Sequence, residues 1–491
     1  GMNRRNFLRR SMATAGAAGL MLPRGAWAQE ATPGAGPYGS IDGRSPDENG
    51  LILPEGFTSR VLAVSGLPVA GTGYAWHAYP DGAACFATDD GGWNYVCNSE
   101  VFQPRGFGGV SRVRFAADGR VLEAQRIVEG TTGNCAGGPT PWGTWLSCEE
   151  FDTTGGEAEP ESQPAGMVWE SDPTGEQPAV ARPAMGLFSH EAAAVDPVDE
   201  VVYMTEDQFD GLLYRFTPAS YPDLSVGRLE AAVVSDELSV RWREIPDPTS
   251  LSGSVRTQLP EATRFQGGEG LWYHDGVIFF STKWDGKLHA IHLREQRYEL
   301  VYDQEAYDQP LLDGLDNVTV DPGSGDVFVA EDTTDPLELV IVSVERELAA
   351  FCRLDMSRHD GSEITGPCFS PDATRLYFSS QRGGSEDAPT VVGSDHPRHE
   401  GRKAGITYEI TGPFRGAAVL AEARVAGPDP EPETTPRGTD DTRGDAPSTP
   451  LPTATVAAAA EEDALLREQA NTSEASDDGF RAGALLGLGA A

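Results

Sequence analysis

The chain has 491 residues, enough for one large domain or for two to three domains of ordinary size. Its 57 glycines and 36 prolines favour turn-rich β structure over a helical protein. The formal net charge of -39 at pH 7 argues against nucleic-acid binding, because such a surface repels phosphates. A phosphate ester bound through cations is still compatible with this charge.

Residues 1–28 are expected to be removed from the mature protein. Gly1 before Met2 is interpreted as a cloning scar, and "NRRNFLRRS", a small and apolar run and "AWA" follow before Gln29. Paired arginines, a weakly hydrophobic stretch and a small-x-small cleavage site are typical of a twin-arginine export signal. The sequence therefore predicts a periplasmic or extracellular protein that uses the twin-arginine export machinery. No later segment is apolar enough to predict a transmembrane helix.

Residues 29–44 are expected to form a linker, and residues 45–424 the folded domain. Short β-branched and aromatic runs recur in this domain, each closed by small or acidic residues and associated with a turn signal. The six runs are 84–92, 144–150, 201–207, 277–283, 326–332 and 375–381. Successive units begin roughly 50 to 75 residues apart, a spacing that suits four-stranded blades. We therefore predict an all-β fold, a six-bladed β-propeller; a two-sheet sandwich would not explain the shared acidic ends.

Residues 425–491 are dominated by Pro, Thr, Ala and acidic residues, and aromatic residues are missing until Phe480. Such a segment buries too little apolar area to offset the entropy of ordering it. It is predicted to be a disordered C-terminal tail.

The register of the hairpins predicts that acids gather at one mouth of the central channel. A candidate ligand stands 13 to 15 residues before each closing position, so that Cys135 precedes Glu149, Glu191 precedes Glu206, and Asn317 precedes Glu331. In an antiparallel hairpin the start of the first strand lies opposite the end of the second. The candidate metal ligands are Cys135, Glu149, Glu150, Glu191, Glu206, Asp207, Glu269, Asp316, Asn317, Glu331 and Asp332.

Nine carboxylates at one mouth would repel each other unless cations neutralise them, and basic residues such as Lys283 are scarce. Hard ions such as Ca²⁺ suit carboxylates, and a thiolate at Cys135 adds affinity for a softer transition metal such as iron. The alternative is that these acids form a solvated rim that serves solubility.

At these residues the chain resembles the PhoX-type alkaline phosphatases, exported bacterial propeller enzymes. The matching stretches are "NCAGGPTPWGTWLSCEE", "SHEAAAVDPVDEVVYMTED", "GGEGLWYHDGVIFFSTKWDG", "GLDNVTVDPGSGDVFVAED" and "GPCFSPDATRLYFSSQ". The resemblance implies Ca²⁺ and Fe³⁺ cofactors. It also implies an iron thiolate at Cys135, carboxylate ligands at Glu149, Glu191 and Glu269, and calcium positions at Asp316, Asn317 and Glu331.

The candidate catalytic residues are Glu269, Arg264 and His190. Gly267 stands where the family pattern has an arginine two residues before the glutamate of the "EG" motif, and Arg264 lies three residues upstream of it. An arginine there would bind the substrate phosphate through two parallel hydrogen bonds. His190 either contacts the substrate or serves the fold.

The six cysteines leave a second interpretation open, because export makes disulfides possible. Cys135 could pair with Cys148, Cys85 with Cys97, and Cys352 with Cys368. The metal interpretation instead predicts that Cys135 is a thiolate ligand and that Cys148 is not.

The expected function is a secreted, metal-dependent phosphomonoesterase that acts as a monomer on a small phosphate ester. A Ca²⁺-dependent lactonase of the gluconolactonase or paraoxonase kind is the second hypothesis. The third is a metal-stabilised propeller that binds without catalysis.

Overall fold

The computed structural model describes residues 31–102, 106–151, 165–382 and 404–426. The chain divides into two compact units, 1–429 and 430–491, and the second unit lies outside the described residues. The predicted export signal and nearly all of the predicted tail lie outside them too. In the described part of the chain, no helix is long and apolar enough to cross a membrane.

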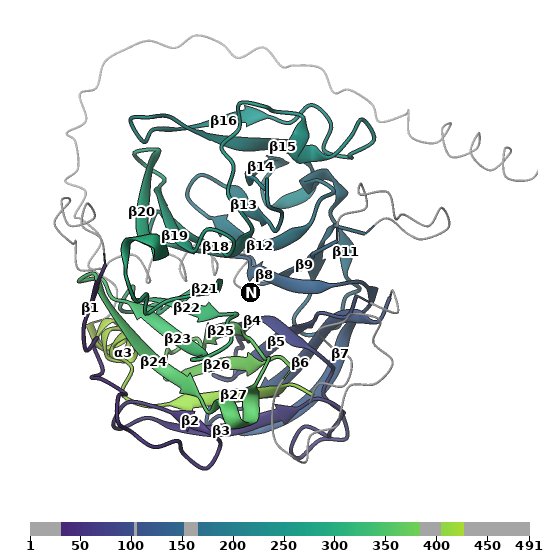
Figure 1. Cartoon of the computed structure of the whole chain (residues 1–491). Helices are drawn as coiled ribbons and strands as arrows, with labels where there is room; N and C mark the ends of the chain where they lie inside the picture. Colours follow the sequence, from purple (N-terminus) through teal and green to yellow (C-terminus); the bar gives the residue numbers. More distant parts are fainter. Residues whose placement is uncertain (1–30, 103–105, 152–164, 383–403, 427–491) are drawn as a thin grey trace, which may run out of the picture. The chain divides into compact units, whose positions relative to one another are not determined.

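The described residues form six sheets arranged around a central axis, which is the predicted six-bladed β-propeller (Figure 1). Their strands pair antiparallel, except that β1 (Thr32–Pro33) pairs parallel with β24 (Glu347–Leu354). Each sheet contributes one inner strand, and these strands contact one another in chain order, with the last contacting the first. The inner strands are β4 (Pro80–Ala87), β8 (Asn134–Pro139), β12 (His190–Asp196), β17 (Gly268–His274), β21 (Leu315–Val320) and β25 (Ile364–Phe369).

Each inner strand forms a hairpin with a second strand. The second strands are β5 (Trp93–Ser99), β9 (Trp145–Glu149), β13 (Val201–Glu206), β18 (Val277–Thr282), β22 (Val327–Glu331) and β26 (Arg375–Ser380). Five of these strands match the predicted runs. The first does not, because residues 84–92 cover the end of β4 and the turn, and β5 follows them.

The outer strands complete the blades. They are β6 (Gly108–Phe115), β7 (Val121–Thr131), β10 (Val168–Ser171), β11 (Val180–Ala181), β14 (Leu213–Ser220), β15 (Asp223–Val234), β16 (Val240–Glu244), β19 (Lys287–His292), β20 (Arg297–Asp303), β23 (Glu338–Val342), β24 (Glu347–Leu354) and β27 (Ile406–Thr411). The described helices are short: η3 (Pro183–Met185), η4 (Val255–Thr257), η5 (Gln304–Ala306), α2 (Met356–His359) and α3 (Arg415–Ala426).

The sixth blade joins the two ends of the domain. Its outermost strand is β3 (Thr58–Val64), which pairs antiparallel with β27 near the end of the domain. The ring is therefore closed by backbone hydrogen bonds between distant parts of the sequence, and these must break before the blades can separate. Two further N-terminal strands, β1 (Thr32–Pro33) and β2 (Leu51–Ile52), pair with β24; β1 lies within the segment expected to be a linker.

Apolar side chains between neighbouring blades form the core. Leu146 of β9 and Met204 of β13 are both fully buried and belong to one cluster. Phe328 of β22 and Phe378 of β26 belong to another. Because each sheet buries both faces against its neighbours, its strands are apolar on both sides, which explains the continuous apolar runs in the sequence.

The same irregularity recurs at the start of all six inner strands. Between two paired positions the inner strand advances three residues while its partner advances two, so each inner strand carries one extra residue. Such β-bulges change the direction of a side chain and are frequent next to functional sites. The six bulges lie at equivalent positions of the blades, and therefore at the same mouth.

Inner strands of neighbouring blades approach each other closely at glycines. A Cβ atom added to Gly138 would lie 1.8 Å from the carbonyl oxygen of Ala193 in the next blade. The side-chain hydrogen of Gly138 thus permits a backbone contact that any larger residue would prevent.

We expect Gly138→Ala to destabilise the propeller by about 3 kcal/mol, because the clash is with backbone atoms that cannot rotate away. Chemical denaturation would measure this loss. Gly73→Ala is the matched control, since its Cβ would meet no atom within 4 Å, and it should change stability little. Equal effects of both substitutions would contradict the close inter-blade contact.

Candidate metal centre at the mouth of the propeller

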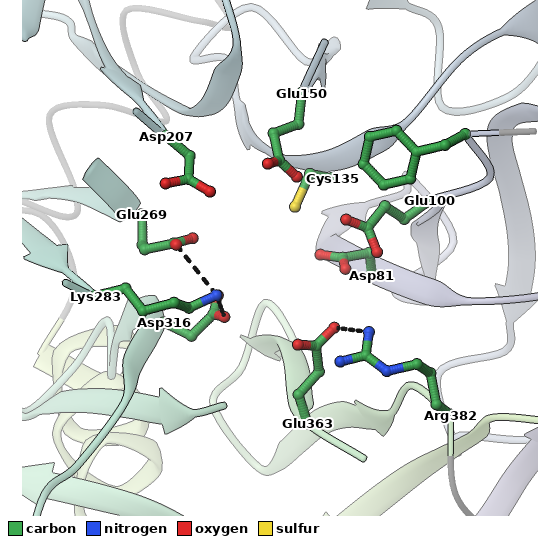
Figure 2. Close-up of a pocket in the computed structure, with 11 residues that line it drawn as sticks. Asp81, Glu100, Cys135, Glu150, Asp207, Glu269, Lys283, Asp316, Glu363 and Arg382 are labelled. Atoms are coloured by element: carbon green, nitrogen blue, oxygen red, sulfur yellow. Dashed lines mark hydrogen bonds and ion pairs between the residues drawn. The ribbon is translucent and has the colours of Figure 1, made fainter. Parts of the chain in front are cut away.

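The mouth that carries the bulges contains a cavity of about 100 Å³ (Figure 2). Its lining has seven carboxylates and one thiol, but only two basic side chains. The lining residues are Asp81, Glu100, Phe102, Cys135, Glu150, Asp207, Glu269, Lys283, Asp316, Glu363 and Arg382. Glu191 and Asp332 lie beside this set, within 4.8 Å of other ligand atoms of the mouth.

Two positions in each blade supply most of these residues. The first is the bulge of the inner strand, which holds Asp81, Cys135, Glu191, Glu269, Asp316 and, in the sixth blade, Gly366. The other position lies at the end of the second strand of each hairpin. It comes directly after the residue that pairs with the inner strand just before the bulge. It holds Glu100, Glu150, Asp207, Lys283, Asp332 and Ser380. The fold thus repeats one geometry and varies the chemistry by residue type.

The structure brings seven of the eleven predicted ligands to this mouth. They are Cys135, Glu150, Glu191, Asp207, Glu269, Asp316 and Asp332. Asn317 lies next to them; its Nδ2 donates to Asp316 Oδ1 at 2.8 Å, and its Oδ1 accepts from the N–H of Gly366 at 2.7 Å. Asn317 is therefore placed to orient Asp316.

The remaining three glutamates end their strands facing away from the cavity. Glu149 accepts the backbone N–H groups of Thr132 and Met167 at 3.0 and 3.2 Å. Glu331 likewise accepts those of Asp313 and Glu338 at 2.9 and 2.8 Å.

Glu206 has the same role in the third blade, where it accepts from the N–H of Leu212 at 3.2 Å and from Tyr214 Oη at 2.7 Å. All three carboxylates anchor loops. The reason is register: the strand-ending glutamate pairs with the residue before the bulge, and the next residue turns into the mouth.

Two of the three candidate catalytic residues do not reach the cavity. The buried ring of His190 stacks on Phe188, and its Nε2 lies 2.9 Å from the carbonyl oxygen of Gly186. Burial lowers the pKa of His190 to about 4. Arg264 is exposed, and its guanidinium donates to the carbonyl oxygen of Arg256 at 2.7 Å. Glu269, by contrast, lines the cavity.

Gly267, the position of the arginine in the family pattern, lies against Trp284. A Cβ at Gly267 would be 2.0 Å from the indole ring, and the residue has a positive φ of 69°. Trp284 Nε1 donates to Asp207 Oδ1 at 3.3 Å. The tryptophan therefore fills the space that a side chain at position 267 would need.

Sequence reasoning missed Asp81, Glu100 and Glu363. The first two were missed because the turn at residues 89–92 was interpreted as the end of the first unit. The run "YVCNSE" contained the signal, since Glu100 follows a β-strand as Glu150 and Asp207 do. Glu363 precedes the sixth inner strand, and the other units have no ligand at that position.

Burial dominates the electrostatics of the mouth. It raises the pKa values of Asp81, Glu150 and Glu191 well above those of ordinary carboxyl groups, and neighbouring carboxylates raise them further. Burial, followed by the charges of Asp81 and Glu191, also raises the pKa of Cys135. Each ionised group at this mouth is therefore costly unless a cation lies beside it.

Two basic side chains offset part of this charge (Figure 2). Lys283 Nζ lies 3.2 Å from Glu269, 2.9 Å from Asp316 and 3.3 Å from Asp332. Burial opposes its charge, but these carboxylates outweigh burial and raise the pKa of Lys283 well above its ordinary value. Arg382 pairs with Glu363 at 2.5 Å.

The donor set of the mouth fits metal ions. Four groups of three residues have ligand atoms within 4.8 Å of one another: Asp81–Glu100–Cys135, Cys135–Glu150–Glu191, Glu191–Glu269–Asp316 and Asp316–Asp332–Glu363. Among the described residues, the fully buried Glu191 Oε2 has no hydrogen-bond partner. A cation would satisfy this atom and would keep the Cys135 thiol ionised.

All six cysteines lie in described segments and are free thiols. The alternative pairings of Cys135 with Cys148, Cys85 with Cys97 and Cys352 with Cys368 are therefore absent from this structure. Cys148 is buried in the apolar cluster between the second and third blades, away from the cavity lining.

Without metal, Glu191→Gln should stabilise the protein at pH 8 by about 1 kcal/mol, because it removes a buried charge. A carboxyl group whose pKa is raised on folding holds more protons when folded, so wild-type stability increases as the pH falls toward the unfolded pKa. The difference in stability between Glu191→Gln and the wild type should therefore vanish by about pH 5. Melting curves recorded in a chelator at several pH values would measure this difference, with substitution of an exposed residue, Glu295→Gln, as the control. A gap independent of pH would contradict this account.

Residues 106–299 match the family model "Alkaline phosphatase PhoX". Among solved structures, Pseudomonas fluorescens PhoX in complex with vanadate is 17% identical with a TM-score of 0.59, over 80% of this chain and 100% of that chain. A gluconolactonase from Xanthomonas campestris is 12% identical with a TM-score of 0.40, over 72% and 89%. A search of curated protein sequences found no match to this chain. The likeness to the Pseudomonas fluorescens structure shows that the two chains share the propeller fold. The family match confirms, for residues 106–299, the resemblance to the PhoX alkaline phosphatases that the sequence motifs predict.

Proposed function

We propose that this chain is an exported, metal-dependent phosphomonoesterase whose metal ions bind at the mouth of the propeller. The observation that carries the proposal is the meeting of the Cys135 thiol with buried carboxylates in one cavity. The family match over residues 106–299 supports phosphate-ester hydrolysis as the reaction. Pseudomonas fluorescens PhoX binds vanadate, a transition state analogue, and we expect vanadate to bind here as well.

Fe³⁺ would be held by Cys135 with Glu150 and Glu191, since the thiolate favours a transition metal over calcium. Ca²⁺ would be held by carboxylates alone, and Asp81 and Glu100 on the other side of Cys135 are suited to it. When bound, such ions supply Lewis-acid charge to the phosphoryl oxygens and lower the pKa of a bound water.

The chain itself contributes position and charge. Arg382 is the guanidinium in the described cavity lining, and Glu363 holds it there. Its planar donors suit a phosphoryl oxygen, so we assign to Arg382 the phosphate-binding role expected of Arg264. Gln381 donates to Asp81 Oδ2 at 2.6 Å and to Glu100 Oε2 at 2.7 Å. These hydrogen bonds fix the two carboxylates that form a ligand group with Cys135.

The number of acids and the thiol favour a phosphatase over a calcium-dependent lactonase. A lactonase of the expected kind needs fewer carboxylates and no thiolate. An assay with both p-nitrophenyl phosphate and a sugar lactone distinguishes the two activities directly.

The test of this function compares Cys135→Ser with Cys148→Ser. We expect Cys135→Ser to lose the transition metal and to lower phosphomonoester hydrolysis by about two orders of magnitude or more, while calcium is largely retained. Cys148→Ser should keep both metal and activity, because its sulfur lies in the apolar core. Elemental analysis and the rate of p-nitrophenyl phosphate hydrolysis would measure these effects.

Wild-type protein purified with metals that hydrolyses the lactone but no phosphomonoester would refute the proposed reaction. Equal behaviour of the two serine variants would refute the role of Cys135.

Chelation with EGTA is expected to abolish hydrolysis and to lower the melting temperature, since ions that bind only the folded state stabilise it.

A further inference from the structure

The two sides of the mouth differ in how their charge is balanced. On the side of Cys135, the groups Asp81–Glu100–Cys135 and Cys135–Glu150–Glu191 form no ion pair with a lysine or arginine of the described residues. On the opposite side, Lys283 contacts Glu269, Asp316 and Asp332, and Arg382 contacts Glu363. Two of the four ligand groups are thus already in contact with a positively charged side chain.

Lys283 occupies a position that carries a carboxylate in four other blades. It directly follows the second strand of the fourth blade, as Glu100, Glu150, Asp207 and Asp332 follow theirs. Exchanging a carboxylate for an ammonium changes the local charge by two units, which is the charge of one divalent ion. The chain has only three lysines, Lys283, Lys287 and Lys403, so this basic residue is exceptional in the sequence as well.

The geometry around Lys283 resembles that of a bound cation. Its Nζ is within 3.3 Å of oxygens from three carboxylates that belong to three different strand ends or bulges. Figure 2 shows two of them, Glu269 and Asp316. The backbone N–H of Lys283 donates to the carbonyl oxygen of Gly267 at 2.9 Å, which fixes the start of the side chain. An ion at this corner would need the volume that the ammonium now fills.

We infer that Lys283 takes the place of one divalent cation in the mouth and thereby confines bound metal ions to the side of Cys135. The inference rests on the proposed metal-dependent function, and it concerns the number and position of the ions. It predicts that this chain binds fewer ions than its count of mouth carboxylates would allow.

The direct test is the metal content of Lys283→Met, which keeps the unbranched stem of the side chain and removes the charged end. We expect the variant to bind one more calcium ion per chain than the wild type, measured by elemental analysis and calorimetric titration with CaCl₂. Lys283→Arg keeps the positive charge and should bind as many ions as the wild type. The control Lys287→Met removes a lysine that, within the described residues, forms its ion pair with Asp285, at 3.0 Å. It should leave the metal content unchanged.

Equal, non-zero metal content in wild type and Lys283→Met would overturn the inference and leave the proposed function standing. Absence of bound metal from both proteins would overturn the inference together with the metal-dependent function. These two failures are therefore distinguishable.

A measurement on the wild type keeps the inference testable if Lys283→Met does not fold. Acetylation of Lys283 is followed by mass spectrometry in metal-free and metal-loaded protein, with Lys287 as the internal reference. We expect Lys283 to react slowly in both states, because three carboxylates surround its ammonium group and limit access to it. An increase of about tenfold or more on metal loading would show that metal displaces the side chain, and would overturn the inference.

Discussion

Negative charge that is buried and crowded is the constraint on which the mouth of this propeller depends. Seven carboxylates and a thiol line one cavity, where desolvation makes each ionised group costly and each neighbour of like charge makes it more so. Protons, internal basic residues and bound cations are the three ways to offset this cost. Lys283 and Arg382 supply basic residues on one side, and on the side of Cys135 the charge must be offset by protons or by bound cations.

The fold creates this situation by repeating one backbone geometry six times. The inner strands form a closed ring, and each has a bulge at the same place, so that the residue in the bulge and the residue after the second strand both turn into the mouth. The chemistry then depends on residue type alone. The second blade has Cys135 and the fourth has Lys283. The sixth has Gly366 in its bulge and presents Glu363 from just before β25 and Arg382 from just after β26. One scaffold therefore holds a thiol, carboxyl groups and basic groups within a single cavity.

The propeller could be predicted from the sequence because strand runs and turn signals recur at blade spacing, and five of the six second strands match. The site was harder to predict, because adjacent acids such as Glu149 and Glu150 differ by one residue in register and face opposite ways. A sequence does not reveal the bulge that decides between them. His190 and Arg264 were misplaced for another reason, since loop contacts with Gly186 and Arg256 determine where their side chains lie.

The most direct test of the account is a crystal structure of protein purified with its native metals, with anomalous diffraction recorded on both sides of the iron absorption edge and at a long wavelength for calcium. The account predicts an iron peak within bonding distance of Cys135 Sγ and calcium peaks beside it at Asp81, Glu100 or Glu191. An anomalous map without peaks at the mouth, or with metal bound only at Glu149, Glu206 or Glu331, would contradict it.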